Sequence, residues 1–436
     1  MAIMNNPARN RASRPGLPRP AAPQSGSGGA KRASLAIAIS GVAAALGHST
    51  AAQAAADAAD PFDFYVADRY WYDDNLFRLS DLAEPSSDLS APRRSRDDYV
   101  NRVSAGIEAR VDASRQVFGL DLRIDDVRYQ NNDDLDYTGG EGKLNWKWQL
   151  GSHLSGDING SYERALASFN NYELFVRDIV DVASYGGRVR YGIGSRWGVF
   201  AGGSVATAEH SAEIRKLNEF HSETGRAGIE YQTPSGNLFT LGYDFVDARF
   251  PVAERTPGVI AANYEDTIPA ASLAYAFTVK TSLYVRAGYL SRDYEDPTLE
   301  DYSGDIWNVT LHWEPRAKID FDIKAWRDLR AYSDAESDYF VSTGGSIEPH
   351  WDITSAVRLL GEYSMESQKY VGTRALIDPE AGRRDDDVQS ARVALEYSPR
   401  DLISIALGYN WMNRDSNRVL RTYDDNIASV QVKLTF

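Results

Sequence analysis

The last residues of the sequence alternate between apolar and polar side chains. One parity carries only apolar residues, namely Ala428, Val430, Val432, Leu434 and Phe436, and the other carries Ser429, Gln431, Lys433 and Thr435. Because successive side chains of a β-strand point to opposite faces, this pattern predicts a strand with one apolar and one polar face.

The same alternation recurs along most of the chain. Clear examples are residues 239–245, 307–313, 319–325 and 403–411, and aromatic residues stand near the ends of several of these segments. A soluble β-sandwich also alternates, but its strands usually have about five or six residues, whereas these segments run to roughly 10 to 16. The length therefore favours a transmembrane β-barrel over a sandwich.

Two kinds of connection alternate between the strand-like segments. The short ones have turn chemistry and lie at 112–114, 151–152, 194–195, 233–236, 280–281, 314–315, 351–352 and 398–401. The longer, acidic ones include 73–98, 169–181, 250–262, 370–384 and 413–424. This alternation predicts an all-β, up-and-down antiparallel barrel of about 18 strands with both termini on the periplasmic side.

Composition excludes several other classes of protein. The 436 residues include no cysteine, so a disulfide framework and thiolate chemistry are excluded. After the start of the chain no apolar run approaches the length of about 18 residues that a membrane-spanning helix needs. The mean hydropathy of −0.44 agrees with a barrel in which only alternate residues face lipid.

The N-terminus has the features of an export signal. Six basic residues precede an apolar run at 35–46, and the stretch Ala52-Gln53-Ala54 resembles a cleavage site. We expect residues 1–54 to be a cleaved secretory signal peptide rather than a short membrane anchor, and residues 55–436 to form an outer-membrane barrel. Without residues 1–54 the chain has 62 acidic and 41 basic side chains, a net charge of −21, which argues against nucleic acid as a partner.

Several arginines occupy the parity that we expect to face the barrel lumen. They are candidates for a solute path: Arg110, Arg123, Arg188, Arg190, Arg286 and Arg392. A barrel of about 18 strands is wide enough for an aqueous channel, and mixed charge along its wall could guide a hydrated solute. The alternative is a solvated inner wall in which these charges only form cross-strand ion pairs.

The sequence shows no convincing catalytic constellation, cofactor motif or metal-ligand spacing. His312 is the only loose candidate for an enzyme, and a polar lumen residue is the simpler interpretation. The stretches Asp385-Asp386-Asp387 and Asp133-Asp134 could bind Ca²⁺ at the rim, although solvated acidic loops are commoner. We therefore expect a protein that is not an enzyme and that has no cofactor and no metal site.

Two segments carry resemblances to known proteins. The terminal strand with Phe436 resembles the C-terminal signature of bacterial outer-membrane barrels, which implies that the barrel assembly machinery reads Phe436 as an assembly signal. The stretch Tyr72-Asp73-Asp74-Asn75-Leu76-Phe77-Arg78-Leu79 resembles the opening of the EpsL family of exosortase-associated outer-membrane proteins. That resemblance implies a passive role in the biosynthesis or export of an extracellular polysaccharide, together with other export components.

Two other functions stay open at this stage. One is a general diffusion porin, for which residues 73–98 form the only connection long enough to constrict the lumen. The other is a non-conducting scaffold of a polysaccharide secretion complex in the outer membrane.

Overall fold

A computed structural model describes residues 61–82, 94–171, 176–331, 337–372 and 382–436. Eighteen strands dominate it: β1 (Phe62–Asp73), β2 (Asp98–Ala113), β3 (Gln116–Tyr129), β4 (Tyr137–Leu150), β5 (Leu154–Leu166), β6 (Ile179–Ile193), β7 (Trp197–His210), β8 (Phe220–Gln232), β9 (Leu238–Arg249), β10 (Tyr264–Thr278), β11 (Thr281–Tyr294), β12 (Tyr302–Arg316), β13 (Ile319–Ala331), β14 (Tyr339–Asp352), β15 (Val357–Val371), β16 (Asp385–Arg400), β17 (Ile403–Ser416) and β18 (Tyr423–Thr435). The helices are short: η1 (Asp133–Leu135), η2 (Phe169–Asn171), η3 (Glu213–Asn218), α1 (Pro251–Arg255) and η5 (Val419–Arg421). The predicted signal peptide 1–54 lies outside the described residues.

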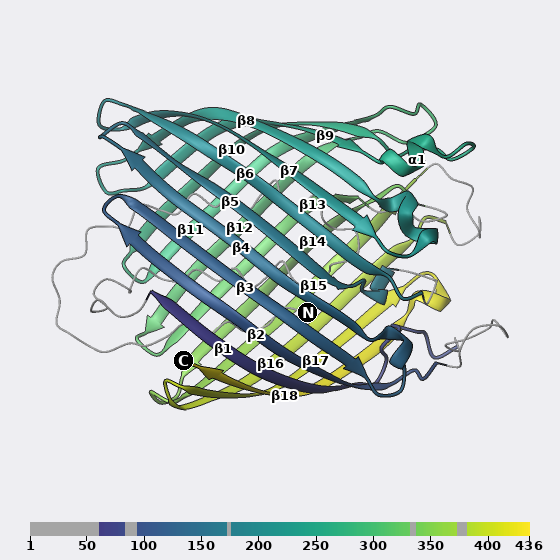
Figure 1. The fold of residues 1–436 in the computed structure, drawn as a ribbon. Coiled ribbons are helices and arrows are strands. Elements are labelled where there is room, and N and C mark those ends of the chain that lie inside the picture. Colours follow the sequence, from purple (N-terminus) through teal and green to yellow (C-terminus); the bar gives the residue numbers. More distant parts are fainter. Residues whose placement is uncertain (1–60, 83–93, 172–175, 332–336, 373–381) are drawn as a thin grey trace.

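The strands form one closed antiparallel barrel (Figure 1). Each strand pairs with its sequence neighbours, and β1 pairs with β18 to close the ring. The backbone N–H of Phe436 donates to the carbonyl of Phe64 at 2.7 Å, which extends this pairing by one residue. The predicted fold class and strand number are confirmed.

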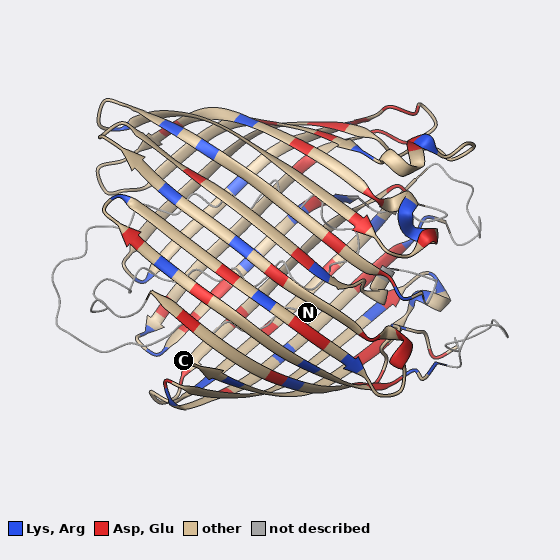
Figure 2. Ribbon diagram, in the orientation of Figure 1, with Lys and Arg blue, Asp and Glu red and all other residues tan. Residues whose placement is uncertain are grey.

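The outer face of the wall is apolar, as the alternation predicts. On β9, for example, Leu241 and Tyr243 are 59% and 50% exposed, while the intervening parity carries Asp244, which is only 2% exposed. Charged residues recur along the strands and also occupy the connections at the end of the barrel that carries α1 (Figure 2). Since the polar backbone groups are paired within a closed sheet, such a wall can face hydrocarbon.

Some predicted connections are displaced. The turn predicted at 314–315 is wrong, because β12 continues through Pro315 to Arg316 and the pairing with β13 shifts register there. The turn predicted at 398–401 is wrong for the same reason, since Pro399 lies within β16 at another register shift. Proline lacks an N–H group, so a β-bulge accommodates it without a turn. The predicted turn at 351–352 also moves, to 353–356, and the long loop predicted at 413–424 shrinks to 417–422.

Apolar side chains cover part of the inner wall at the end of the barrel that carries the long connections. Leu76, Phe77 and Leu79 pack on lumen-facing residues such as Val100 and Val127. On the other side of the barrel, residues from α1 and the segments beside it pack on lumen-facing residues of β6 to β11. These contacts narrow the mouth of the barrel. Within the described part of the chain, no helix has the length and hydrophobicity needed to cross a membrane.

Candidate functional site

The six predicted arginines all occupy the lumen-facing parity of their strands. Arg188 and Arg190 on β6, for instance, alternate with Val189 and Tyr191, which are 46% and 53% exposed on the outer face. Each of the six also has a carboxylate partner. All six arginines therefore form ion pairs, as expected for the alternative in which these charges belong to a solvated inner wall.

Arg188 and Arg190 share one carboxylate, that of Glu230 on β8. The Nε atom of Arg190 lies 2.6 Å from Oε2 of Glu230, and an Nη atom of Arg188 contacts Oε1. The Arg188 guanidinium also lies 4.1 Å from the ring centroid of Phe200. Because Glu230 is only 2% exposed and the two arginines are more accessible, this group presents one excess positive charge to the lumen.

A second group of the same type centres on Asp244 of β9. Arg286 on β11 and Arg226 on β8 both donate to Oδ2 of this buried carboxylate, each at 2.8 Å. Sequence reasoning missed Arg226, because its outward neighbours Gly225 and Ala227 are small and give little alternation signal. The strand order makes this group possible, since β9 and β10 separate β8 from β11 around the wall.

Arg123 and Arg110 are more fully compensated. Arg123 lies 3.0 Å from Asp125 and 3.1 Å from Glu141, which also contacts Lys143. Arg110 lies near the turn that joins β2 and β3, is exposed, and pairs with Asp112 at 3.3 Å. Neither group presents an excess of positive charge.

A third group contains Arg392 on β16 together with Arg69 and Arg102. Of these three arginines, only Arg392 is among the residues predicted from the sequence. Arg392 lies 3.0 Å from Asn410 and 3.1 Å from Glu362. Arg69 on β1 and Arg102 on β2 are direct cross-strand partners, and the charges of Arg102 and Arg392 both act on Arg69. In the first strand, the outward Asp68 breaks the apolar alternation, and this obscured the lumen-facing position of Arg69.

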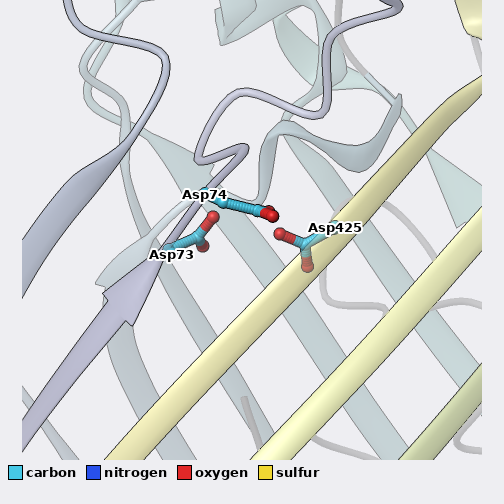
Figure 3. A group of neighbouring side chains, drawn as sticks. All are labelled: Asp73, Asp74 and Asp425. Carbon is cyan, nitrogen blue, oxygen red and sulfur yellow. The ribbon is translucent and has the colours of Figure 1, made fainter.

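Three carboxylates gather at the mouth of the barrel (Figure 3): Asp73, Asp74 and Asp425. Arg78 donates to Asp73 at 3.1 Å and to Asp425 at 2.9 Å. Asp425 lies beyond the lipid belt, because its outward neighbours Asp424 and Asn426 are polar. Burial raises the pKa of Asp425 to about 8, so one proton and Arg78 together neutralise much of the cluster.

The acidic stretches predicted as possible Ca²⁺ sites are engaged by arginine. The buried Asp386 accepts from Arg384, and Asp134 pairs with Arg94. His312 is a lumen-wall residue whose Nδ1 lies 2.9 Å from Oδ1 of Asp322. In each acidic stretch one carboxylate is therefore held in an ion pair, and Asp322 is the partner of His312.

One family model agrees with the barrel architecture. Residues 275–436 match the family model described as putative beta-barrel porin 2. No curated protein sequence matches the chain. Similar solved structures include OpdK of Pseudomonas aeruginosa, at 11% identity and TM-score 0.44, which covers 86% of this chain and 99% of its own.

Two other solved structures show the range of these similarities. OccK2 (OpdF) of Pseudomonas aeruginosa, in complex with glucuronate, has 9% identity, TM-score 0.45 and coverage of 86% and 98%. The siderophore receptor PirA of Acinetobacter baumannii has 7% identity, TM-score 0.41 and coverage of 86% and 80%. At such values these structures identify neither a family nor a solute. The closed barrel, its apolar outer face and the porin-family match together identify the chain as a porin-like outer-membrane β-barrel.

Proposed function

We propose that this barrel is a passive outer-membrane channel through which a sugar polymer passes during the biosynthesis or export of an extracellular polysaccharide. The observation that carries the proposal is a closed barrel of 18 strands whose inner wall is lined with charged and polar side chains. Barrels of about 16 to 18 strands enclose an aqueous channel. A polar wall of this kind can exchange hydrogen bonds with sugar hydroxyls as they lose water.

Two further features support a sugar polymer as the solute. The stretch Tyr72–Leu79 resembles the EpsL family, and it forms the cluster at the mouth around Asp73 and Arg78. Tyr284 occupies the lumen-facing parity of β11, where its ring could stack on a sugar face. If the polymer is anionic, the shared groups around Glu230 and Asp244 supply positive charge along its path.

A general diffusion porin is the second candidate. It is favoured by the first long connection, whose described residues 76–79 pack on the inner wall as a constriction would. A non-conducting scaffold is the third candidate, and the apolar packing of both sides of the mouth favours it.

Single-channel conductance in a planar bilayer separates the three candidates. The probe is the refolded chain without residues 1–54, measured with and without the purified extracellular polysaccharide of the host. We expect stable openings that the polymer blocks. Openings indifferent to the polymer would indicate a general porin, and a folded but silent barrel would indicate the scaffold.

A further inference from the structure

Two neighbouring arginines of the lumen wall, Arg69 and Arg102, have no carboxylate of their own among the described residues. Arg69 is only 8% exposed, and the polar contact that the structure gives its guanidinium is a long one, 3.4 Å to the hydroxyl of Ser429. Arg102, its cross-strand partner, has a buried Nε atom with no hydrogen-bond acceptor. Among the described residues, neither arginine lies within ion-pair distance of a carboxylate, in contrast to Arg188 or Arg286.

A small hollow in the wall opens beside these arginines. It has a volume of about 50 Å³ and is lined by Arg69 and Arg392 together with the polar side chains of Asn410, Ser429 and Gln431. The space exists because the lumen-facing residues behind it are small, notably Ala406 and Gly408. A Cβ atom added at Gly408 would come within 2.8 Å of the Ser429 hydroxyl.

The hollow lies in the middle third of the strands that form it, away from both ends. Arg69 is the eighth of twelve residues of β1, and Arg392 is the eighth of sixteen residues of β16. The ring of Trp71 lies on the side of the Arg69 guanidinium that is nearer the mouth, and the guanidinium carbon is 5.4 Å from the ring centroid. The hollow is therefore reached from the middle of the lumen.

The surrounding charges favour a single negative charge in the hollow. Of the cations near the hollow, Arg392 pairs with Glu362 and Lys433 pairs with Glu108. The carboxylate that acts most on Arg102 is Asp125, and the charges that act on Glu396 are those of Arg358, His350 and Asp352. Arg69 is therefore the cation of the hollow without a carboxylate of its own among the described residues, and its single positive charge matches a monoanion better than a doubly charged phosphate or sulfate.

The size of the hollow restricts the ligand further. A water needs roughly 10 to 15 Å³ of such space, so about 50 Å³ accepts a group as large as a few waters and excludes a sugar ring. A carboxylate fits this volume and accepts two parallel hydrogen bonds from one guanidinium. We propose that Arg69 and Arg392 form a subsite for the carboxylate of a sugar acid, whose ring stays in the lumen. This inference deepens the proposed function and rests on it for the origin of the sugar.

Isothermal titration calorimetry on the folded, detergent-solubilised barrel tests the subsite without requiring conduction. The probes are galacturonate, with galactose as the uncharged match and inorganic sulfate as the doubly charged anion. We expect galacturonate to bind and galactose not to bind. We expect Arg69→Gln to weaken galacturonate binding on the order of tenfold or more, since a charged hydrogen-bond donor is lost.

Two further variants control the experiment. Arg110→Gln removes one lumen-side charge at the turn end of β2 and should leave binding unchanged. Arg69→Lys keeps the positive charge but lacks the planar guanidinium, so it should bind galacturonate more weakly than the unmodified barrel. This variant keeps the test possible if Arg69→Gln does not fold. Equal binding of galactose, stronger binding of sulfate, or unchanged binding by both Arg69 variants would overturn the subsite. A barrel that binds galacturonate but stays silent in the bilayer keeps the subsite and overturns the proposed transport.

Discussion

Arg292 of β11 and Asp266 of β10 form a two-bond ion pair that is sealed from solvent. Both nitrogen–oxygen distances are 2.7 Å, and the side chains are 0% and 2% exposed. The guanidinium carbon lies 3.5 Å from the ring centroid of Tyr264. The pair is surrounded by the apolar cluster that narrows one side of the mouth, which includes Ile268 and Leu290.

Breaking this pair should destabilise the barrel strongly. Asp266→Asn leaves a buried guanidinium without its counter-charge, and we expect a loss of about 3–5 kcal/mol in the free energy of unfolding. Urea unfolding of the barrel in lipid vesicles measures this change. Asp293→Asn, an exposed neighbour on β11, is the matched control and should change stability by less than about 0.5 kcal/mol. Equal effects of the two substitutions would contradict the assigned role of the pair.

The carboxylate of Glu230 should set the ion selectivity of the lumen beside β6. Glu230→Gln removes the charge that Arg188 and Arg190 share, so we expect a severalfold increase in the permeability of anions over cations. The reversal potential in a potassium chloride gradient measures this ratio, and Arg188→Gln with Arg190→Gln should shift it the opposite way. Glu265→Gln, on the outer face of β10, is the control. If neither the Glu230 variant nor the double arginine variant changes the permeability ratio of anions to cations, these groups lie outside the conducting path.

The stability of the cluster at the mouth should decrease as the pH rises toward about 8. Burial raises the pKa of Asp425 from 3.8 to about 8, so between these values the folded protein binds a proton that the unfolded chain does not. The stability that this proton contributes is fully present below the unfolded pKa and is lost as the pH rises through the folded one. Trypsin cleavage after Arg78, relative to an unstructured peptide, should therefore become faster as the pH rises toward about 8 and level off above it. Asp425→Asn should make the relative rate independent of pH, and a wild-type rate that does not change would contradict the assignment.

Phe436 remains a predicted assembly signal, and two measurements separate that role from a structural one. The backbone of Phe436 pairs with Phe64 through its N–H and its carbonyl, and Phe436→Ala preserves both bonds. We expect this variant to refold from urea into detergent as well as the unmodified chain does, and to reach the outer membrane of cells in much smaller amounts. Equal losses in both assays would assign Phe436 a packing role only.

Much of the wall could be predicted from the sequence, because lipid on one face and water on the other impose a strict period of two. The strand number and the lumen-facing parity of Arg188 and Arg286 follow from that period. The predicted position of a turn is wrong where proline lies in a β-bulge, as at Pro315. Proline is common both in turns and in bulges, so its presence in the sequence does not distinguish the two.

The groupings on the inner wall could not be predicted from the period alone. The period gives the face that Arg69 occupies but not the distance from Arg69 to Arg392, which depends on ring closure between β1 and β18. The contact of Arg78 with Asp425 depends on the same closure. Individual charges are therefore predictable from the sequence, whereas the neighbours that these charges share are not.

The pairing of β1 with β18 affects the protein during its synthesis and folding. The first strand synthesised has no partner on one edge until the last strand arrives, so both edges of the growing sheet offer unpaired backbone groups during this time. Pairing between segments so distant in sequence is slow, which prolongs the exposure. A chain that loses β18 to truncation keeps two adhesive edges permanently, and we expect chaperones and proteases to recognise such a chain through these edges.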